Sequence, residues 1–300
     1  MSSIKINFKS FGGALLVFTG AFCFSSKAVM VKLAYRYGID PVSLLNLRMI
    51  FSMPFFLIAA IYAGKNTATQ KLTGRQWIYL IFLGIVGYYL ASYFDFTGLK
   101  YITAALERLI LFVYPTLVIV ISALLFKRPI GRKEIIALLL TYSGIALAFV
   151  NDIKLYSSDV VIGGLLIFGS ALTYAMYLIG SGKLIPVIGS LRFNAYCMLV
   201  STLAVLIHFL LIDTANIFTF PQEVYALGLL MAVFATVIPS FLLAEGIRMI
   251  GAGKASIIGS IGPVSTIILA WLILDEPITL LQMAGTALVL SGVLFVSKNH

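Results

Sequence analysis

A set of six ionisable side chains lies within long apolar stretches of this 300-residue chain, at similar depth. A charged group at the centre of a bilayer costs about 2.5–3.5 kcal/mol on insertion scales, so such groups are functional candidates by default. Opposite charges at similar depth can pair, which lowers the cost of each. This chemistry suits the binding of a charged solute or the transfer of a proton, and it also suits a fixed ion-pair network that closes a gate. The six residues are Lys27, Lys32, Arg48, Asp95, Glu107 and Arg108, and Lys32 also fits a side chain that reaches out to the lipid headgroups.

Within this set we expect Lys27, Arg48 or Arg108 to meet a solute carboxylate, and Asp95 or Glu107 to meet an amino group or carry a proton. Glu107 and Arg108 are adjacent in sequence, and adjacent residues on a helix point about 100° apart. One of the two can therefore face a cavity while the other meets a neighbouring helix.

Two polar stripes are predicted beside these charges. Tyr88, Ser92 and Asp95 follow i, i+4, i+7 spacing, and Tyr174 and Tyr177 are three residues apart, so each group shares one face of a helix. Tyrosine rings can pack a side chain while their hydroxyls bind its polar groups. Each tyrosine taken alone also fits a structural role in helix contacts.

Prolines and small residues mark the positions where the helices are expected to bend. Pro115 and Pro263 fall in the middle of apolar stretches, where each frees a backbone carbonyl one turn earlier. They are the predicted hinges, with a static kink as the alternative. Ser256 and Ser260, just before Pro263, give that helix a small polar face suited to close packing or to a ligand.

The elements that carry these residues are membrane helices. The chain is 61% hydrophobic and 11% charged, whereas soluble proteins have about 25% charged residues. A helix needs about 20 apolar residues to cross a bilayer. Ten such runs are expected, and the fold class is an all-α integral membrane protein with ten transmembrane helices. The runs are 12–33, 42–63, 77–97, 103–126, 134–150, 160–181, 192–212, 222–244, 252–274 and 279–297.

This arrangement leaves only short loops, without room for a separate catalytic or nucleic-acid-binding domain. The chain has two histidines and no G-x-S-x-G or H-E-x-x-H motif, so neither hydrolase chemistry nor a histidine-rich metal site is indicated. We therefore expect a protein that is not an enzyme, with no cofactor, no metal and no nucleic-acid partner.

The same pattern occurs twice, at residues 98–150 and 246–298. With an offset of 148, Gly98 falls on Gly246, Pro115 on Pro263 and Pro129 on Pro277. The predicted division is a first five-helix repeat at 1–150 and a second at 151–300. Five helices per half give the repeats opposite orientations, and such inverted repeats are common in secondary transporters.

The distribution of Lys and Arg places both termini in the cytoplasm. Only Arg36, Lys100 and Lys154 then lie in outer loops.

With these features in view, the chain resembles the EamA-type branch of the drug/metabolite transporter superfamily. The resemblance is most specific from Gly98 to Arg128 and from Gly246 to Pro277. It implies a central cavity lined by helices one to four of each half, with the fifth and tenth helices at the periphery. Members export amino acids and other small metabolites, or exchange sugar phosphates and nucleotide sugars.

The resemblance leads us to expect a secondary transporter in a bacterial inner membrane, exporting small polar metabolites, most of all amino acids, by alternating access. The alternatives are an exchanger of organic phosphates or nucleotide sugars and a proton-coupled drug exporter. The small multidrug members use a glutamate in the first helix, where this chain has Lys27 and no acidic residue. The expected partners are a small-molecule substrate, the lipid bilayer and protons as a candidate coupling ion, and both a monomer and a homodimer stay open.

Overall fold

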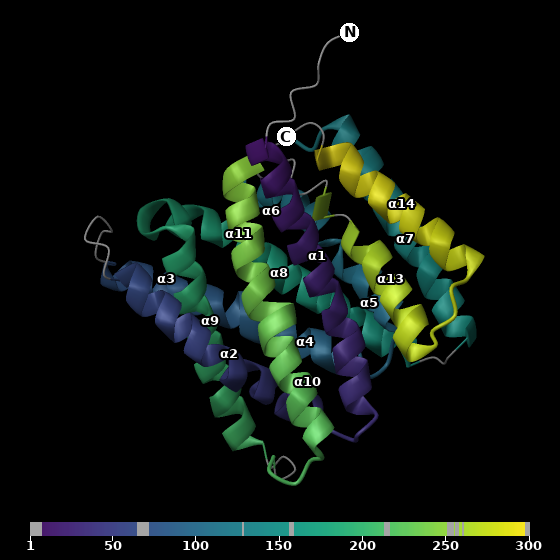
Figure 1. Cartoon of the computed structure of the whole chain (residues 1–300). Helices are drawn as coiled ribbons and strands as arrows, with labels where there is room; N and C mark the ends of the chain where they lie inside the picture. The colour runs from purple at the N-terminus through teal and green to yellow at the C-terminus, as the bar shows by residue number, and fades with distance from the viewer. Residues whose placement is uncertain are drawn as a thin grey trace.

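The structure is a computed structural model that describes residues 8–64, 72–127, 129–155, 159–212, 217–250, 255, 258–259 and 261–297. Within these residues every regular element is a helix (Figure 1), which confirms the expected all-α class. A bilayer favours this choice because a helix satisfies its backbone hydrogen bonds internally. The helices of residues 8–155 are α1 (Phe8–Tyr35), α2 (Pro41–Gly64), α3 (Gly74–Gly84), η1 (Ile85–Leu90), α4 (Ala91–Gly98), α5 (Ala104–Leu111), α6 (Tyr114–Phe126) and α7 (Arg132–Leu155).

The later helices repeat this order. They are α8 (Val160–Ile188), α9 (Ser190–Leu211), α10 (Gln222–Ala232), η2 (Val233–Val237), α11 (Ile238–Ile250), α13 (Ile261–Leu274) and α14 (Leu280–Ser297). Among the described residues, seven continuous spans are long and apolar enough to cross a membrane, and three more apolar segments are shorter. The shorter ones are Glu134–Val150, Ile261–Leu274 and Leu280–Phe295, which correspond to the fifth, ninth and tenth predicted helices.

Two of the predicted helices contain a π-helical segment that the apolar pattern did not indicate. The third is built from α3, η1 and α4, and the eighth from α10, η2 and α11. The segments begin at Ile85 and Val233, which are 148 residues apart. Pro239 follows η2 and has no N–H to donate, so the regular hydrogen-bond ladder is already interrupted there. π-helical turns of this kind occur frequently at functional sites.

The fourth predicted helix is interrupted as well. Its first part, α5, ends at Leu111, and α6 begins at Tyr114 after a short break. Pro115 is therefore the second residue of α6 and lies in its first turn, where a missing N–H is tolerated. Pro263 lies in α13, whose first residue, Ile261, adjoins residue 260, which is outside the described residues. Their role as hinges stays a prediction.

Close glycine contacts join the first half of the chain to the second. A methyl group added to Gly246 of α11 would lie 3.1 Å from the carbonyl oxygen of Gly13 in α1. Further along α1, Gly20 lies against Leu243, so residue numbers rise along α1 as they fall along α11, and the two helices are antiparallel. Small residues allow the helix backbones to approach closely, which is how helices associate in membranes.

The same contact recurs between α8 and α4. A methyl group on Gly163 of α8 would lie 3.0 Å from the carbonyl oxygen of Gly98 in α4, and Gly169 lies against Phe94. This pair is antiparallel too. The first helix of each half thus packs antiparallel to the third helix of the other half.

The helices α7 and α14 pair at one edge of the molecule (Figure 1). A methyl group on Gly144 would lie 2.5 Å from the carbonyl oxygen of Gly285, and one on Gly285 would lie 2.6 Å from that of Gly144. Only glycine fits on either side of this crossing. In Figure 1 the first turn of α1 and the last turn of α14 lie at the same end of the bundle.

We predict that Gly144→Ala lowers the thermal stability of the protein in detergent. The added methyl meets backbone atoms that cannot rotate away, and overpacking of this kind costs about 1–3 kcal/mol. Gly182→Ala is the matched control, because a methyl there meets nothing within 4 Å. We expect the control to unfold at the wild-type temperature or slightly above it, and equal melting temperatures for the two variants would contradict the close crossing.

Candidate functional site

A cavity of about 400 Å³ lies between the two halves of the chain. Residues of α1, α2, η1, α4, α5 and α6 line it from the first half, and residues of α8, α9, η2 and α11 line it from the second. Among the described residues, no side chain of α7 or α14 reaches it, as the family resemblance implied. Its main polar lining residues are Lys27, Arg48, Tyr88, Ser92, Asp95, Arg108, Tyr114, Ser170, Tyr174, Thr236 and Ser240.

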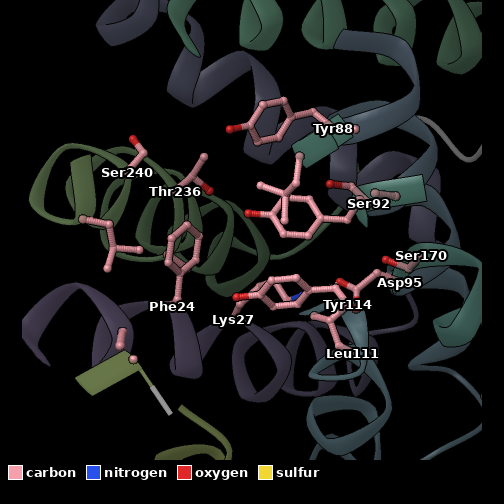
Figure 2. Close-up of a pocket in the computed structure, with 18 of the residues that line it drawn as sticks. Phe24, Lys27, Tyr88, Ser92, Asp95, Leu111, Tyr114, Ser170, Thr236 and Ser240 are labelled. Carbon is pink, nitrogen blue, oxygen red and sulfur yellow. The ribbon is translucent and has the colours of Figure 1, made fainter. Parts of the chain in front are cut away.

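Figure 2 shows residues of both halves around this space. Thr236 and Ser240 of the second half lie on one side, and Ser92 and Asp95 of the first half lie on the other, with Ser170 of the second half beside Asp95. Among the described lining residues, every charged side chain comes from the first half and the second half contributes hydroxyl groups and apolar surface.

Lys27 of α1 stands at the centre of the charged cluster. Its Nζ lies 2.5 Å from Oδ2 of Asp95 in α4 and 3.1 Å from Oε1 of Glu107 in α5. Asp95 is 3% exposed and Glu107 is fully buried. The prediction that these opposite charges pair is therefore confirmed. We call these three residues the ion cluster.

Arg48 of α2 is buried beside the ion cluster without joining it. Its Nη2 donates a hydrogen bond to Oγ of Ser92 at 3.3 Å, and its guanidinium lies 5.1 Å from the centre of the Phe96 ring. A cation over a ring face gains electrostatic energy when it is desolvated. The Nε atom of Arg48 is buried and has no hydrogen-bond partner among the described residues.

Arg108 and Glu107 point in different directions, as their adjacency predicted. Glu107 turns inward to Lys27, whereas Arg108 lines the cavity. The guanidinium of Arg108 lies against α13, where a methyl group on Gly262 would come within 2.9 Å of its Nη2. Glycine at position 262 thus makes room for Arg108, whose Nε has no hydrogen-bond partner within the part of the chain that the structure describes.

The predicted polar stripe of Tyr88, Ser92 and Asp95 faces the cavity. Tyr88 lies in η1, and its hydroxyl donates to Oδ1 of Asn194 at 2.6 Å. The hydroxyl of Tyr177 donates in turn to that of Tyr88 at 3.4 Å. Asn194 of α9 was not singled out in the sequence, although an amide inside an apolar span is a signal that could have identified it.

Tyr174 lines the cavity, whereas Tyr177 is buried behind Tyr88. The ring of Tyr174 packs edge-on against Tyr114 at 5.2 Å between centroids, and the ring of Tyr177 packs edge-on against Tyr88 at 5.0 Å. A methyl group at Gly87 would overlap the ring of Tyr177, so glycine there is needed for this contact. The aromatic wall therefore has one tyrosine layer at the cavity and a second layer that supports it.

The predicted residues Ser256 and Ser260 lie outside the described residues. Three further polar lining residues of the second half, Ser170, Thr236 and Ser240, were not among the predicted site residues. Thr236 lies in η2 and its Oγ1 donates to the carbonyl of Met231 at 3.0 Å, five residues earlier, so the π-helical segment sets where this side chain lies.

We predict that Lys27→Met destabilises the protein strongly, because it leaves two buried carboxyl groups without their cation. Removing one partner of a buried ion pair costs about 3–5 kcal/mol. Adding Asp95→Asn and Glu107→Gln to Lys27→Met should restore much of the stability, as measured by thermal unfolding in detergent. Lys183→Met on the exposed side of α8 is the control and should have little effect. The ion-cluster account fails if the triple variant is no more stable than Lys27→Met.

Comparisons with known proteins agree with this architecture. The EamA-like transporter family matches residues 11–150 and again residues 161–298. An uncharacterized transporter of Bacillus subtilis, YcbK, is 32% identical over 95% of this chain and 91% of its own length. An uncharacterized transporter of Archaeoglobus fulgidus is 24% identical over 95% of this chain and 96% of its own length. A solved crystal structure that covers 95% of this chain and 96% of its own has a TM-score of 0.66 at 17% identity, which shows a shared fold. The chain belongs to the EamA-like transporter family.

Proposed function

We propose that this membrane transporter exports small polar metabolites, amino acids above all, and that it does so by alternating access. The observation that carries the proposal is the cavity between the two halves, which is lined by both the cationic Arg48 and the acidic Asp95. Each of these residues has a buried polar atom without a hydrogen-bond partner among the described residues. A solute with a carboxylate and an ammonium group carries the charges complementary to the guanidinium of Arg48 and the carboxylate of Asp95. Nothing in this chemistry requires a catalytic step.

The donor is Arg48 and the acceptor is Asp95. Arg48 has an unpartnered Nε, and Oδ1 of Asp95 is likewise without a partner among the described residues. A buried polar atom without a partner costs about 1–3 kcal/mol, so a ligand that supplies one is favoured. The carboxylate of an amino acid would bind Arg48, and its ammonium group would bind Asp95.

The aromatic wall gives the solute's side chain a place to pack. Tyr88, Tyr114 and Tyr174 line the cavity together with apolar residues such as Phe24 and Leu111 (Figure 2). Binding sites for small molecules are commonly of this kind, mostly apolar with a few well-placed polar groups. This wall supports a metabolite with an apolar part over a bare inorganic ion.

Movement would come from the two halves acting as inverted repeats, residues 1–150 against residues 151–300. Supporting this division, the family matches the chain twice, and the glycine contact between α1 and α11 has a counterpart between α8 and α4. Two arrangements of such halves can expose a central site to either side of the bilayer in turn. The Lys and Arg distribution supports cytoplasmic termini and a bacterial inner membrane.

One contact between the halves is suited to closing the cavity at the end where α5 begins. The Oε1 of Glu276 accepts a hydrogen bond from the backbone N–H of Ala104 at 3.0 Å, and its Oε2 accepts one from Ala105 at 3.4 Å. A carboxylate at a helix N-terminus is stabilised by the helix dipole. We call this contact the Glu276 latch. The equivalent position in the first half is Arg128, whose side chain has no acceptor, so the opposite end lacks the same device in its sequence.

A second candidate is the exchange of organic phosphates. It is favoured by one observation, namely that neither Arg48 nor Arg108 makes an ion pair with a carboxylate among the described residues. Guanidinium groups bind phosphate oxygens well. Counterflow in proteoliposomes separates the two candidates, because phosphate exchange requires an organic phosphate on the opposite side.

We predict that proteoliposomes containing the protein release at least one radiolabelled amino acid faster than empty vesicles. Arg48→Gln and Asp95→Asn should each slow this release by about tenfold or more, since a hydrogen bond to a charged group is worth about 1.5–3 kcal/mol. Lys183→Gln on the exposed side of α8 serves as the matched control. If no amino acid leaves faster than from empty vesicles, the amino acid proposal is wrong.

The latch gives a separate prediction. Glu276→Ala removes both hydrogen bonds to α5, so the cavity should open more often at that end. A cysteine at position 170, in a background with Cys23→Ser, should react about tenfold faster with an impermeant maleimide added to intact cells. Glu223→Ala, in the exposed first turn of α10, is the control. An unchanged labelling rate in Glu276→Ala would rule out the latch as a gate.

A further inference from the structure

The ion cluster contains one more acidic group than basic groups. Among the described residues, Lys27 is the one cation in direct contact with the carboxyl groups, and it contacts both Asp95 and Glu107. Both carboxyl groups are almost completely buried. A buried carboxylate without its own cation is expensive in a low-dielectric interior, and the usual remedy is to take up a proton.

The positive groups nearby do not remove this excess. Arg48, from α2, donates to Ser92, and Arg108, from α5, faces the cavity. Among the described residues neither comes within ion-pair distance of Asp95 or Glu107, since only Lys27 does so. Among the neighbouring phenols, Tyr35 of α1 lies near Asp95, whereas Tyr114 of α6 and Tyr174 of α8 lie near Arg108. The described part of α13 faces the cluster with no ionisable side chain.

The two carboxyl groups also lie close to each other, because both contact the same ammonium group. Nζ of Lys27 lies 2.5 Å from Oδ2 of Asp95 and 3.1 Å from Oε1 of Glu107. The remaining oxygens, Oδ1 of Asp95 and Oε2 of Glu107, are buried without a hydrogen-bond partner among the described residues. Two carboxylates are both acceptors and cannot hydrogen-bond, whereas a carboxylic acid can donate to a carboxylate. The geometry therefore suits a pair that holds one proton.

We propose that Asp95 and Glu107 together bind a single proton beside Lys27, and that this proton is the coupling ion of transport. The proton resides on Glu107 when the cavity is empty, because Glu107 is the more deeply buried of the two. With the proton bound, the cluster has one positive and one negative charge and is neutral. This part of the proposal does not depend on which solute is carried.

The coupling part rests on the proposed function. Asp95 lines the cavity, whereas Glu107 does not, so Asp95 connects the buried acid to water and to the solute. When a solute ammonium binds Oδ1 of Asp95, a second positive charge enters the cluster. The proton on Glu107 then passes to Asp95 and on to cavity water, and the cluster is again neutral. Solute and proton therefore compete for the same negative charge, which couples outward solute movement to inward proton movement.

Infrared difference spectroscopy tests the proton site without any solute. Purified protein in detergent at neutral pH should show the C=O stretch of a protonated carboxyl group that shifts in heavy water. Glu107→Gln should abolish this band, and Glu223→Gln, in the exposed first turn of α10, should leave it unchanged. Asp95→Asn is the second variant and should shift the band, because it replaces the carboxylate that lies beside Glu107 at Lys27.

The proposal is overturned if the wild-type protein has no such band at neutral pH, or if the band survives both Glu107→Gln and Asp95→Asn unchanged.

Coupling is tested in the amino-acid-loaded vesicles by imposing an inward proton gradient with the membrane potential clamped. For one proton per solute, each unit of pH should support about a tenfold solute gradient. Glu107→Gln should still exchange solute, but its solute gradient should not depend on the proton gradient. Coupling is contradicted if the release rate of the wild-type protein does not change with the proton gradient. If the band is present but no amino acid is transported, the proposed function is wrong while the proton site is supported.

Discussion

The contact between the ammonium group of Lys27 and the carboxyl groups of Asp95 and Glu107 is the constraint on which the centre of this molecule depends. Charges inside a bilayer persist only when they are neutralised by each other or by a bound group. The cluster joins α1, α4 and α5, so it fixes the first, third and fourth membrane segments relative to one another. The cavity wall on that side is thereby set by electrostatics, whereas most of the remaining bundle is set by the packing of apolar side chains.

Glycine contacts hold the two halves around this centre. The pairs Gly13 with Gly246 and Gly98 with Gly163 bring helix backbones close together across the seam, where larger side chains would force them apart. These contacts flank the cavity, while the crossing of α7 and α14 lies away from it. The structure therefore separates a tightly packed edge pair from a central group of helices that encloses open space.

Much of the site could be predicted from the sequence, because charged residues inside apolar stretches and residues at helical spacing are easy to recognise there. The stripe of Tyr88, Ser92 and Asp95 faces the cavity as its spacing indicated, since the period of a helix fixes which residues share a face. The spacing could not show which of Glu107 and Arg108 turns inward, because that depends on where Lys27 stands in space. Nor could it show that Asn194 meets Tyr88, a contact between segments 106 residues apart.

The π-helical segments were also beyond the apolar pattern. A run of apolar residues looks the same whether its hydrogen bonds reach back four residues or five, and only Pro239 gives a local hint near η2. The break between α5 and α6 lies just before Pro115, which is the second residue of α6. The sequence had predicted a kink at Pro115 within one continuous helix. Both π-helical segments pack across the seam, η1 against α8 and α9 and η2 against α1 and α2.

The uneven distribution of charge across the seam has a consequence for how such a protein can diversify. Among the described lining residues the second half contributes no charged side chain, only groups such as Ser170, Thr236 and Ser240. Substitutions at these three positions change hydrogen bonding and shape without adding or removing a charge. The shape of the cavity can therefore change through residues of the second half. The charged residues of the first half are more constrained, because a buried charge is stable only when it keeps its partner.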